Sequence, residues 1–337
     1  MRGLGRVKYM ANRAFGRAAI LAYHRVADVP LDPQQLCVTP ERFEEHLRVL
    51  VRDYRPVSLQ RLADQLEAGR SAPRRSVVLT IDDGYADNLL NARPLLQRYG
   101  IPATVFVTSD HVGTGKEIYT STLIRVMLLS ESLPEELVLS VDGENHRWRV
   151  PPDADGRMKV HDELRTLLAS TDSREREGLA GRLLDWAQMP REPRPDYRML
   201  TVDELRELAA DGLVEIGAHT QTHPRLSSLG WSDQIREITG SREVLEAMLG
   251  RPVTAFAYPY GCRGDYNADS VAAAREAGFR VACSVFTGLV TRWTDRWQLP
   301  RYTVRNWDGG RFEQFARWMF SLCPRLTYGG FYENPDG

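Results

Sequence analysis

The sequence predicts an α/β protein in which parallel strands and helices alternate around a barrel. Short apolar runs recur along the 337 residues, helix-like segments separate most of them, and several runs end in polar residues. Strands that alternate with helices are typical of parallel βαβ units, and six or seven such units favour a barrel over a short open sheet. The apolar runs cover residues 18–24, 76–82, 103–108, 213–219, 254–259, 280–285 and 298–304.

Helical periodicity is clear in three segments between these runs. Residues 39–54 place four apolar side chains on one face, Val51 among them, behind Pro40 in the first turn. Residues 200–212 and 232–250 show the same spacing, and each ends at a glycine, a residue that commonly terminates helices. We therefore expect helices in all three segments.

Residues from about 111 to 200 interrupt the alternation. They contain a β-hairpin pattern that turns at Asp142 and Gly143, followed by the spacing of two charged helices. We expect an inserted α+β segment beside the barrel mouth, acting either as a lid over the substrate or as a stabilising cover. The predicted organisation is a basic N-terminal arm at 1–16 and one barrel at 17–337 that contains the insertion.

The composition excludes some classes of protein. Hydrophobic residues make up 42% and charged residues 26% of the chain, as in ordinary soluble domains. With 44 basic and 45 acidic side chains, the chain lacks the basic surplus of a nucleic-acid-binding protein. The four cysteines form no CxxC pair, which argues against a zinc knuckle or a disulfide framework and favours a reducing compartment. They are Cys37, Cys262, Cys283 and Cys323.

The N-terminus is basic, but its longest apolar run is too short to span a membrane and no clear cleavage site follows it. We therefore expect a cytoplasmic protein. Its arm at 1–16 offers a peripheral contact to a membrane surface or to a partner in a biosynthetic complex, and the oligomeric state is left open.

Two adjacent carboxylates, Asp82 and Asp83, close the second apolar run, and Gly84 follows at once. A turn or a helix cap explains one aspartate after a strand, but not two. Like charges this close repel each other, so the pair is costly unless a cation lies nearby. The carboxyl ends of barrel strands meet at one rim, where active sites lie, and His24 and residues 258–261 also fall at strand ends.

A pair of histidines supplies a partner for these carboxylates. His219 and His223 are four residues apart, a spacing that brings two imidazoles to one side of a helical turn, although Pro224 disfavours a longer helix. Two imidazoles and one carboxylate leave one position for water, as in catalytic zinc sites. Asp83 would bind the metal, and Asp82 would accept a proton from the water, whose pKa zinc lowers to about 7. Zinc is the first choice, and Co²⁺, Ni²⁺ or Mn²⁺ are alternatives.

Together, the motifs TIDDG and HTQTHP resemble the first two motifs of the polysaccharide deacetylases with a NodB homology domain, carbohydrate esterase family 4. The resemblance covers about 17–110 and 200–310 and implies a distorted (β/α)7 barrel. It also implies that Asp82 is the catalytic base. The metal ligands that it implies are Asp83, His219 and His223.

The segment FAYPYG resembles the third motif of the same family. By that resemblance, the backbone N–H of Tyr260 holds the oxyanion, and Tyr258 and Gly261 belong to the substrate groove. Such a donor suits amide hydrolysis, because negative charge develops on the former carbonyl oxygen.

Two departures from the family pattern affect the remaining roles. The family usually carries a late histidine as the general acid, but no histidine follows His223. His24, at the end of the first strand, is the candidate replacement, because the chain resembles a subgroup of the family, including enzymes acting on poly-N-acetylglucosamine, in which an early Tyr-His pair supplies the acid. The third motif also usually carries an arginine that orients the base; Ala257 stands at its place, and Arg301 at the end of the last strand is the candidate substitute.

These expectations predict a metal-dependent hydrolase that removes N-acetyl groups from an amino sugar. The sugar would belong to a glycan, such as an exopolysaccharide, to a lipid- or nucleotide-linked sugar, or to a glycosylated metabolite. Two alternatives stay open. One is hydrolysis of a non-sugar amide or an O-acetyl ester at the same site. The other is a catalytically inactive carbohydrate-binding partner, against which the intact set of site residues counts.

Overall fold

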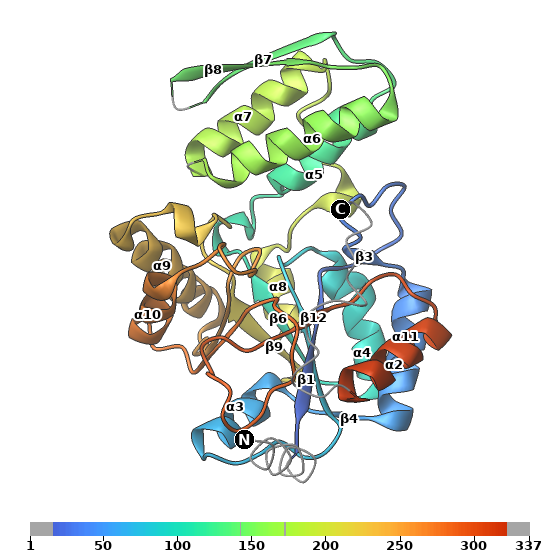
Figure 1. Cartoon of the computed structure of the whole chain (residues 1–337), viewed down its shortest axis with the longest axis vertical. Coiled ribbons are helices and arrows are strands. Elements are labelled where there is room, and N and C mark those ends of the chain that lie inside the picture. Colours follow the sequence, from blue (N-terminus) through green and yellow to red (C-terminus); the bar gives the residue numbers. More distant parts are fainter. Residues whose placement is uncertain (1–15, 142, 172, 322–337) are drawn as a thin grey trace, which may run out of the picture.

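A computed structural model describes residues 16–141, 143–171 and 173–321, and its main sheet contains all seven predicted strands (Figure 1). The paired strands of this sheet run parallel to one another, so the predicted α/β fold class is confirmed. The seven strands are β1 (Ala18–Tyr23), β5 (Ser76–Ile81), β6 (Ala103–Val107), β9 (Val214–Ala218), β10 (Ala255–Ala257), β11 (Val281–Cys283) and β12 (Tyr302–Thr303). Their order is β11-β10-β9-β6-β5-β1-β12, and β4 (Arg55–Pro56) pairs with β5 as an additional strand.

The sheet curls into a half-barrel. Its end strands, β11 and β12, share no ladder, but Cys283 of β11 forms a single parallel bridge with Leu299, just ahead of β12. Two backbone hydrogen bonds support this bridge, from Ser284 to Leu299 at 2.9 Å and from Leu299 to Ala282 at 2.8 Å. Because β12 pairs with β1, the segment 299–303 contacts both ends of the sheet.

Alternate side chains of each strand enter different cores, as the pleat of a strand requires. Along β5, Leu79 and Ile81 pack in the large core that the sheet shares with its outer helices. Val78 packs in a smaller core inside the curl, together with Phe106 of β6. The helix α3 (Leu59–Glu67) contributes three apolar side chains to that inner core.

The outer helices include the three predicted from periodicity. The helix α2 begins after Thr39, whose hydroxyl accepts from the backbone of the first turn, and α9 ends at Gly250 in a left-handed conformation. Two details of the prediction are wrong: Val51 of α2 is 48% exposed, and α8 ends at Leu208, four residues before Gly212. The outer helices are α2 (Pro40–Asp53), α4 (Arg93–Tyr99), α8 (Val202–Leu208), α9 (Trp231–Leu249), α10 (Ala268–Glu276) and α11 (Gly309–Ser321).

The predicted insertion forms the green upper part of Figure 1, where it stands over one end of the half-barrel. It contains the expected antiparallel hairpin and two long helices, and its apolar side chains build a core that Tyr85 joins from the barrel. The elements of the insertion are α5 (Tyr119–Leu123), β7 (Glu136–Val141), β8 (Glu144–Arg149), α6 (Ala154–Ala169) and α7 (Ser173–Trp186). A further two-stranded pair, β2 (Arg25–Val26) and β3 (Cys37–Val38), follows β1.

Some expectations concern the ends of the chain and its cysteines. Within the described ranges, no helix is long and apolar enough to cross a membrane. Cys37, Cys262 and Cys283 are free thiols. The basic arm, apart from Gly16, and Cys323 lie outside the described residues.

Candidate active site

The end of β5 directs Asp82 into the curl of the sheet. Val78 belongs to the inner core, and Thr80, two residues on, accepts a hydrogen bond there from Arg301. The same alternation carries Asp82 to the inner side, and its backbone N–H continues the ladder by donating to Tyr23 O at 2.9 Å. Asp82 is therefore only 2% exposed.

Arg301 holds Asp82 through a two-pronged ion pair. Its Nη1 lies 2.7 Å from Oδ1 and its Nη2 lies 2.8 Å from Oδ2, while Nε donates to Ser284 O at 2.7 Å. This geometry fixes the plane of the carboxylate. Burial raises the pKa of Asp82, but Arg301, His219 and His24 together outweigh burial and leave the pKa below its usual value. Asp82 is therefore ionised at neutral pH.

A left-handed backbone turns Asp83 away from the strand pattern. Asp83 has a φ of 77° and Gly84 a φ of 89°. Strand alternation alone would send Asp83 to the side opposite Asp82, so the turn is what aims both carboxylates at the mouth. At Gly84 a Cβ would lie 3.0 Å from Val107 Cγ1, so a side chain there would crowd Val107 as well as strain the backbone. Burial and the charge of Asp82 raise the pKa of Asp83 to about 7, which shows the cost of a second carboxylate without a cation.

The two histidines lie on a loop after β9, and the predicted helical turn is wrong. Thr220 and His223 have φ values of 63° and 60°, which an α-helix does not contain. Glu237 of α9 holds this loop, because one of its oxygens accepts from Gln221 N at 3.0 Å and from Thr222 N at 2.9 Å. The backbone N–H groups of this loop therefore donate to the buried carboxylate of Glu237 and not to the carbonyls of a preceding helical turn.

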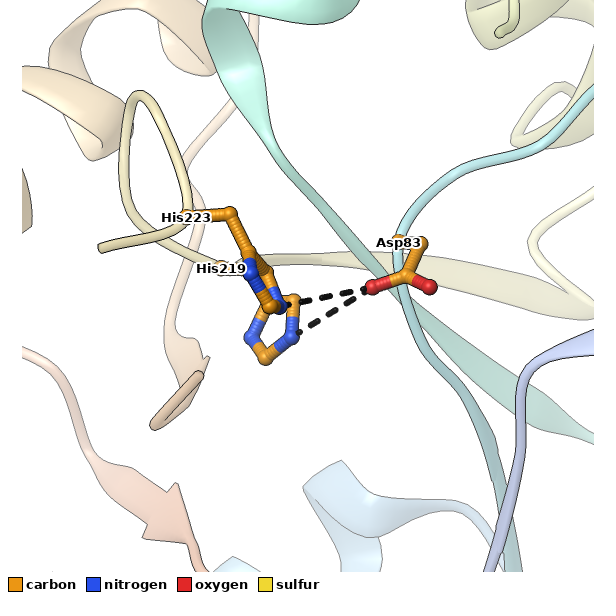
Figure 2. A group of neighbouring side chains, drawn as sticks. All are labelled: Asp83, His219 and His223. Carbon is orange, nitrogen blue, oxygen red and sulfur yellow. Dashed lines mark ion pairs between the residues drawn. The ribbon is translucent and has the colours of Figure 1, made fainter. Parts of the chain in front are cut away.

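Asp83, His219 and His223 converge on one point (Figure 2). Asp83 Oδ1 lies 3.6 Å from His223 Nε2 and 3.8 Å from His219 Nε2. The ligand atoms of all three lie within 4.8 Å of one another, and no other such group occurs within the described ranges. His219 Nδ1 bonds to Ala257 O at 2.7 Å, which orients Nε2 as the second partner of a metal-binding histidine does. Burial lowers the pKa of both histidines, so the donor set, two neutral imidazoles and a carboxylate, fits a divalent metal.

His24 faces Asp82 from the end of β1. Its Nε2 lies 4.0 Å from Asp82 Oδ2. Burial lowers the pKa of His24 to about 4, although the charge of Asp82 acts in the opposite direction. Its Nδ1 is buried and bonds to none of the described residues. The structure thus brings His24, Asp82 and Arg301 into one cluster beside the Asp83 group.

Tyr260 and Gly261 lie on the other side of the histidines. The Tyr260 ring is 4.8 Å from the His223 ring between centroids, and its backbone N–H donates to no described residue. Gly261 has a φ of 68°, and a Cβ there would lie 3.0 Å from Val285 N. A side chain at this position would be strained and crowded, so the turn favours glycine.

Tyr258 does not line the site with its ring, so this part of the prediction is wrong. Its side chain is fully buried, its hydroxyl donates to Trp297 O at 2.9 Å, and its ring stacks on Tyr266. Its side chain alternates outward into the large core beneath the outer helices, together with Phe256, whereas Ala257 between them faces the inner core.

A family model described as polysaccharide deacetylase matches residues 69–129 and 185–282, which include the carboxylate pair and both histidines. Over these two segments the chain matches the polysaccharide deacetylase family. It shares 22% identity over 286 residues with YxkH of Bacillus subtilis (strain 168), a protein named for the same family, covering 85% of this chain and 70% of YxkH.

Two further comparisons extend this result. A stretch of 84 residues is 31% identical to poly-beta-1,6-N-acetyl-D-glucosamine N-deacetylase of Escherichia coli (strain K12), covering 25% of this chain and 12% of that enzyme. The solved structure of the Streptococcus pyogenes deacetylase PplD in complex with acetate matches with a TM-score of 0.57 at 17% identity, over 89% of this chain and 98% of that one. At this identity the structural match shows the shared fold.

In this deacetylase, residues that no sequence motif marked also reach the site. Tyr119 of α5 in the insertion forms a 2.6 Å hydrogen bond between its hydroxyl and that of Tyr260. Arg25 lies buried between two tyrosine rings and forms a 2.8 Å ion pair with Asp87. For Arg25 and Asp87 the one local signal in the sequence is closeness to site residues, since Arg25 follows His24 and Asp87 lies four residues after Asp83.

Proposed function

We propose that this deacetylase is a metal-dependent enzyme that removes N-acetyl groups from an amino sugar. The observation that carries the proposal is the separation of two adjacent carboxylates: Asp82 is held by Arg301, and Asp83 faces two neutral histidines. The Escherichia coli relative, named as acting on poly-N-acetylglucosamine, supports an N-acetylated sugar as the substrate.

Each residue then has a distinct task. Asp83, His219 and His223 would hold a divalent metal, most simply Zn²⁺, which when bound supplies a Lewis acid that polarises a carbonyl and lowers the pKa of water. Asp82 accepts the proton of the attacking water, because Arg301 keeps it ionised and oriented. The N–H of Tyr260 donates to the acetyl oxygen as negative charge develops there.

His24 is the candidate that protonates the leaving amine. In the free protein its imidazole is neutral at pH 7, because burial lowers the pKa to about 4. Negative charge that builds up on the substrate favours the protonated form of a neighbouring imidazole. His24 would therefore take over the proton that Asp82 accepted from the water, since the two groups lie 4.0 Å apart, and pass it to the leaving amine, which leaves Asp82 ionised again.

Acetate release tests this proposal. The zinc-loaded chain would be incubated with N-acetylglucosamine oligomers, O-acetylated xylan and a non-sugar acetamide, with Asp82→Asn as the control. We expect acetate from the N-acetylglucosamine oligomers in the native chain and little from the variant. Acetate from xylan alone would indicate an esterase, and acetate from the simple amide alone a non-sugar amidase. Sugar binding without any release would indicate a binding partner.

A further inference from the structure

A cavity of about 260 Å³ lies between the insertion and the rim of the half-barrel, next to the Asp83 group. Thr222 lines it and directly precedes His223. Tyr119 also lines it, and the Tyr119 hydroxyl bonds to Tyr260, whose ring packs on His223. One layer of side chains therefore separates the cavity from the proposed metal site.

The charge of the cavity wall is positive. Basic side chains outnumber acidic ones, and most of the basic ones already have acidic partners. Lys116 lies 3.0 Å from Glu177, Arg125 lies 3.6 Å from Glu117, and Arg191 pairs with Asp185. The charged side chains of the wall are Lys116, Arg125, Arg176, Arg191, Glu117 and Glu177.

Arg176 is the basic residue whose charge stays unbalanced. Its side chain is buried, with the residue 3% exposed, Nη2 donates to Thr222 O, and the guanidinium lies 4.9 Å from the ring centroid of Tyr119. No carboxylate oxygen of a described residue lies within 4.0 Å of it, and Nη1 is buried without a hydrogen-bond partner. A buried cation in this condition is costly unless an anion joins it. Nδ1 of His111, on the same wall, is also buried without a partner.

We propose that Arg176 and this cavity bind an anionic group, a carboxylate or a phosphate, that the substrate carries beside its N-acetyl sugar. The proposal rests on the proposed deacetylase function and narrows its substrate class to acidic glycans or phosphate-linked amino sugars. Nη1 of the guanidinium has no partner among the described residues and can donate to an anion oxygen, and a planar guanidinium suits an anion with two oxygens. The contact of Arg176 with Thr222 would place that anion within one residue of a metal ligand.

Kinetics with charged and neutral substrates test the inference. The zinc-loaded full chain would be assayed with a neutral N-acetylglucosamine tetramer, with a tetrasaccharide that alternates N-acetylglucosamine and glucuronate, and with uridine diphosphate N-acetylglucosamine. Arg176→Gln should lower kcat/KM by about 10-fold or more for the favoured anionic substrate, mainly through KM, since a charge-assisted hydrogen bond is lost. The neutral tetramer should change by less than about 2-fold, because a single neutral contact contributes little. The anionic substrate that shows the dependence identifies the source of the charge.

Two variants serve as controls. Arg176→Lys keeps the charge but lacks the planar guanidinium, so it should retain only part of the preference. Arg182→Gln, at an exposed position of the same helix, should change nothing. An equal loss on neutral and anionic substrates would mean that Arg176 only supports the fold, and no loss on either anionic substrate would mean that the cavity binds no anion. Both results overturn the inference.

Failure of the proposed deacetylase function can be told apart from failure of the proposed anion site. If the native chain releases no acetate from any substrate, the deacetylase proposal fails, and calorimetric titration with the two anionic sugars then decides the subsite. Binding that Arg176→Gln weakens at least about 10-fold supports it, on the scale of a charged hydrogen bond. Binding that is absent or insensitive to the variant overturns it.

Discussion

The adjacent residues Asp82 and Asp83 contact different partners because the positive φ of Asp83 turns its side chain away from the strand pattern. Asp82 follows the alternation of β5 and meets Arg301 inside the curl, whereas Asp83, at a φ of 77°, leaves the strand pattern and faces His219 and His223. A positive φ at a non-glycine residue is strained, and such strain is found mainly at functional sites. Asp82 therefore stays ionised beside Arg301, whereas burial and the charge of Asp82 raise the pKa of Asp83 to about 7.

The ion pair of Asp82 with Arg301 gives a stability prediction. Arg301→Met leaves Asp82 buried and unpaired, so the free energy of unfolding should fall by about 3–5 kcal/mol in urea denaturation. Adding Asp82→Asn removes the unpaired charge, and the double variant should regain part of this loss. If the double variant is less stable than Arg301→Met, the pair is not held together mainly by charge.

His24 gives a kinetic prediction. His24→Ala should lower the rate of acetate release by about 10² to 10⁴, as for other general acids, while the zinc content stays that of the native chain. His146→Ala, in the β7–β8 hairpin, is a matched control outside the site and should keep full activity. An unchanged rate in His24→Ala would require a different proton donor.

At the scale of elements, the helix α2 shows where periodicity alone misassigns a face. Val51 is apolar and fits the spacing of the core face but is half-exposed, while His46 is fully buried. The His46 Nε2 lies 2.7 Å from Trp307 O, and its ring stacks on Phe312 of α11 at 4.1 Å. His46 is buried on this face because it finds two partners there, the carbonyl of Trp307 just before α11 and the ring of Phe312 within α11. No pattern within α2 indicates either partner.

The burial of His46 predicts a pH dependence of stability. Burial lowers its pKa to about 4, against a usual value of 6.5. Between these values the unfolded chain binds a proton that the folded chain does not, so stability falls as the pH drops from 6.5 toward 4 and is unaffected by this group above 6.5. The contribution reaches about 1.4 kcal/mol per pH unit. Urea denaturation at several pH values should show a shallower slope for His46→Gln, and parallel slopes would contradict the assignment.

For the whole molecule, the sequence predicts what depends on local pattern. Apolar runs that end in Asp82, His219 and His24 marked both the parallel strands and the rim where their carboxyl ends meet. The hairpin of the insertion was predicted for the same reason, because alternation and a turn at Gly143 are local.

Contacts between distant segments could not be predicted in this way. Tyr119 meets Tyr260 across 141 positions, and Arg176 meets Thr222 across 46, so neither contact has a local signature. The loop that carries the histidines was misassigned as a helical turn because Glu237, which holds it, belongs to the following helix. The contacts of the insertion with the rim therefore depend on how the fold packs, and the sequence pattern does not indicate them.

The central claim is the division of work between the two adjacent aspartates. Its most direct test compares zinc content and acetate release in Asp82→Asn and Asp83→Asn. We expect Asp82→Asn to bind zinc as the native chain does and to lose at least about 10² in turnover, because the base is gone. Asp83→Asn should lose the bound zinc. Loss of zinc in Asp82→Asn with full zinc content in Asp83→Asn would contradict the account, because it would show that the two carboxylates have the opposite roles.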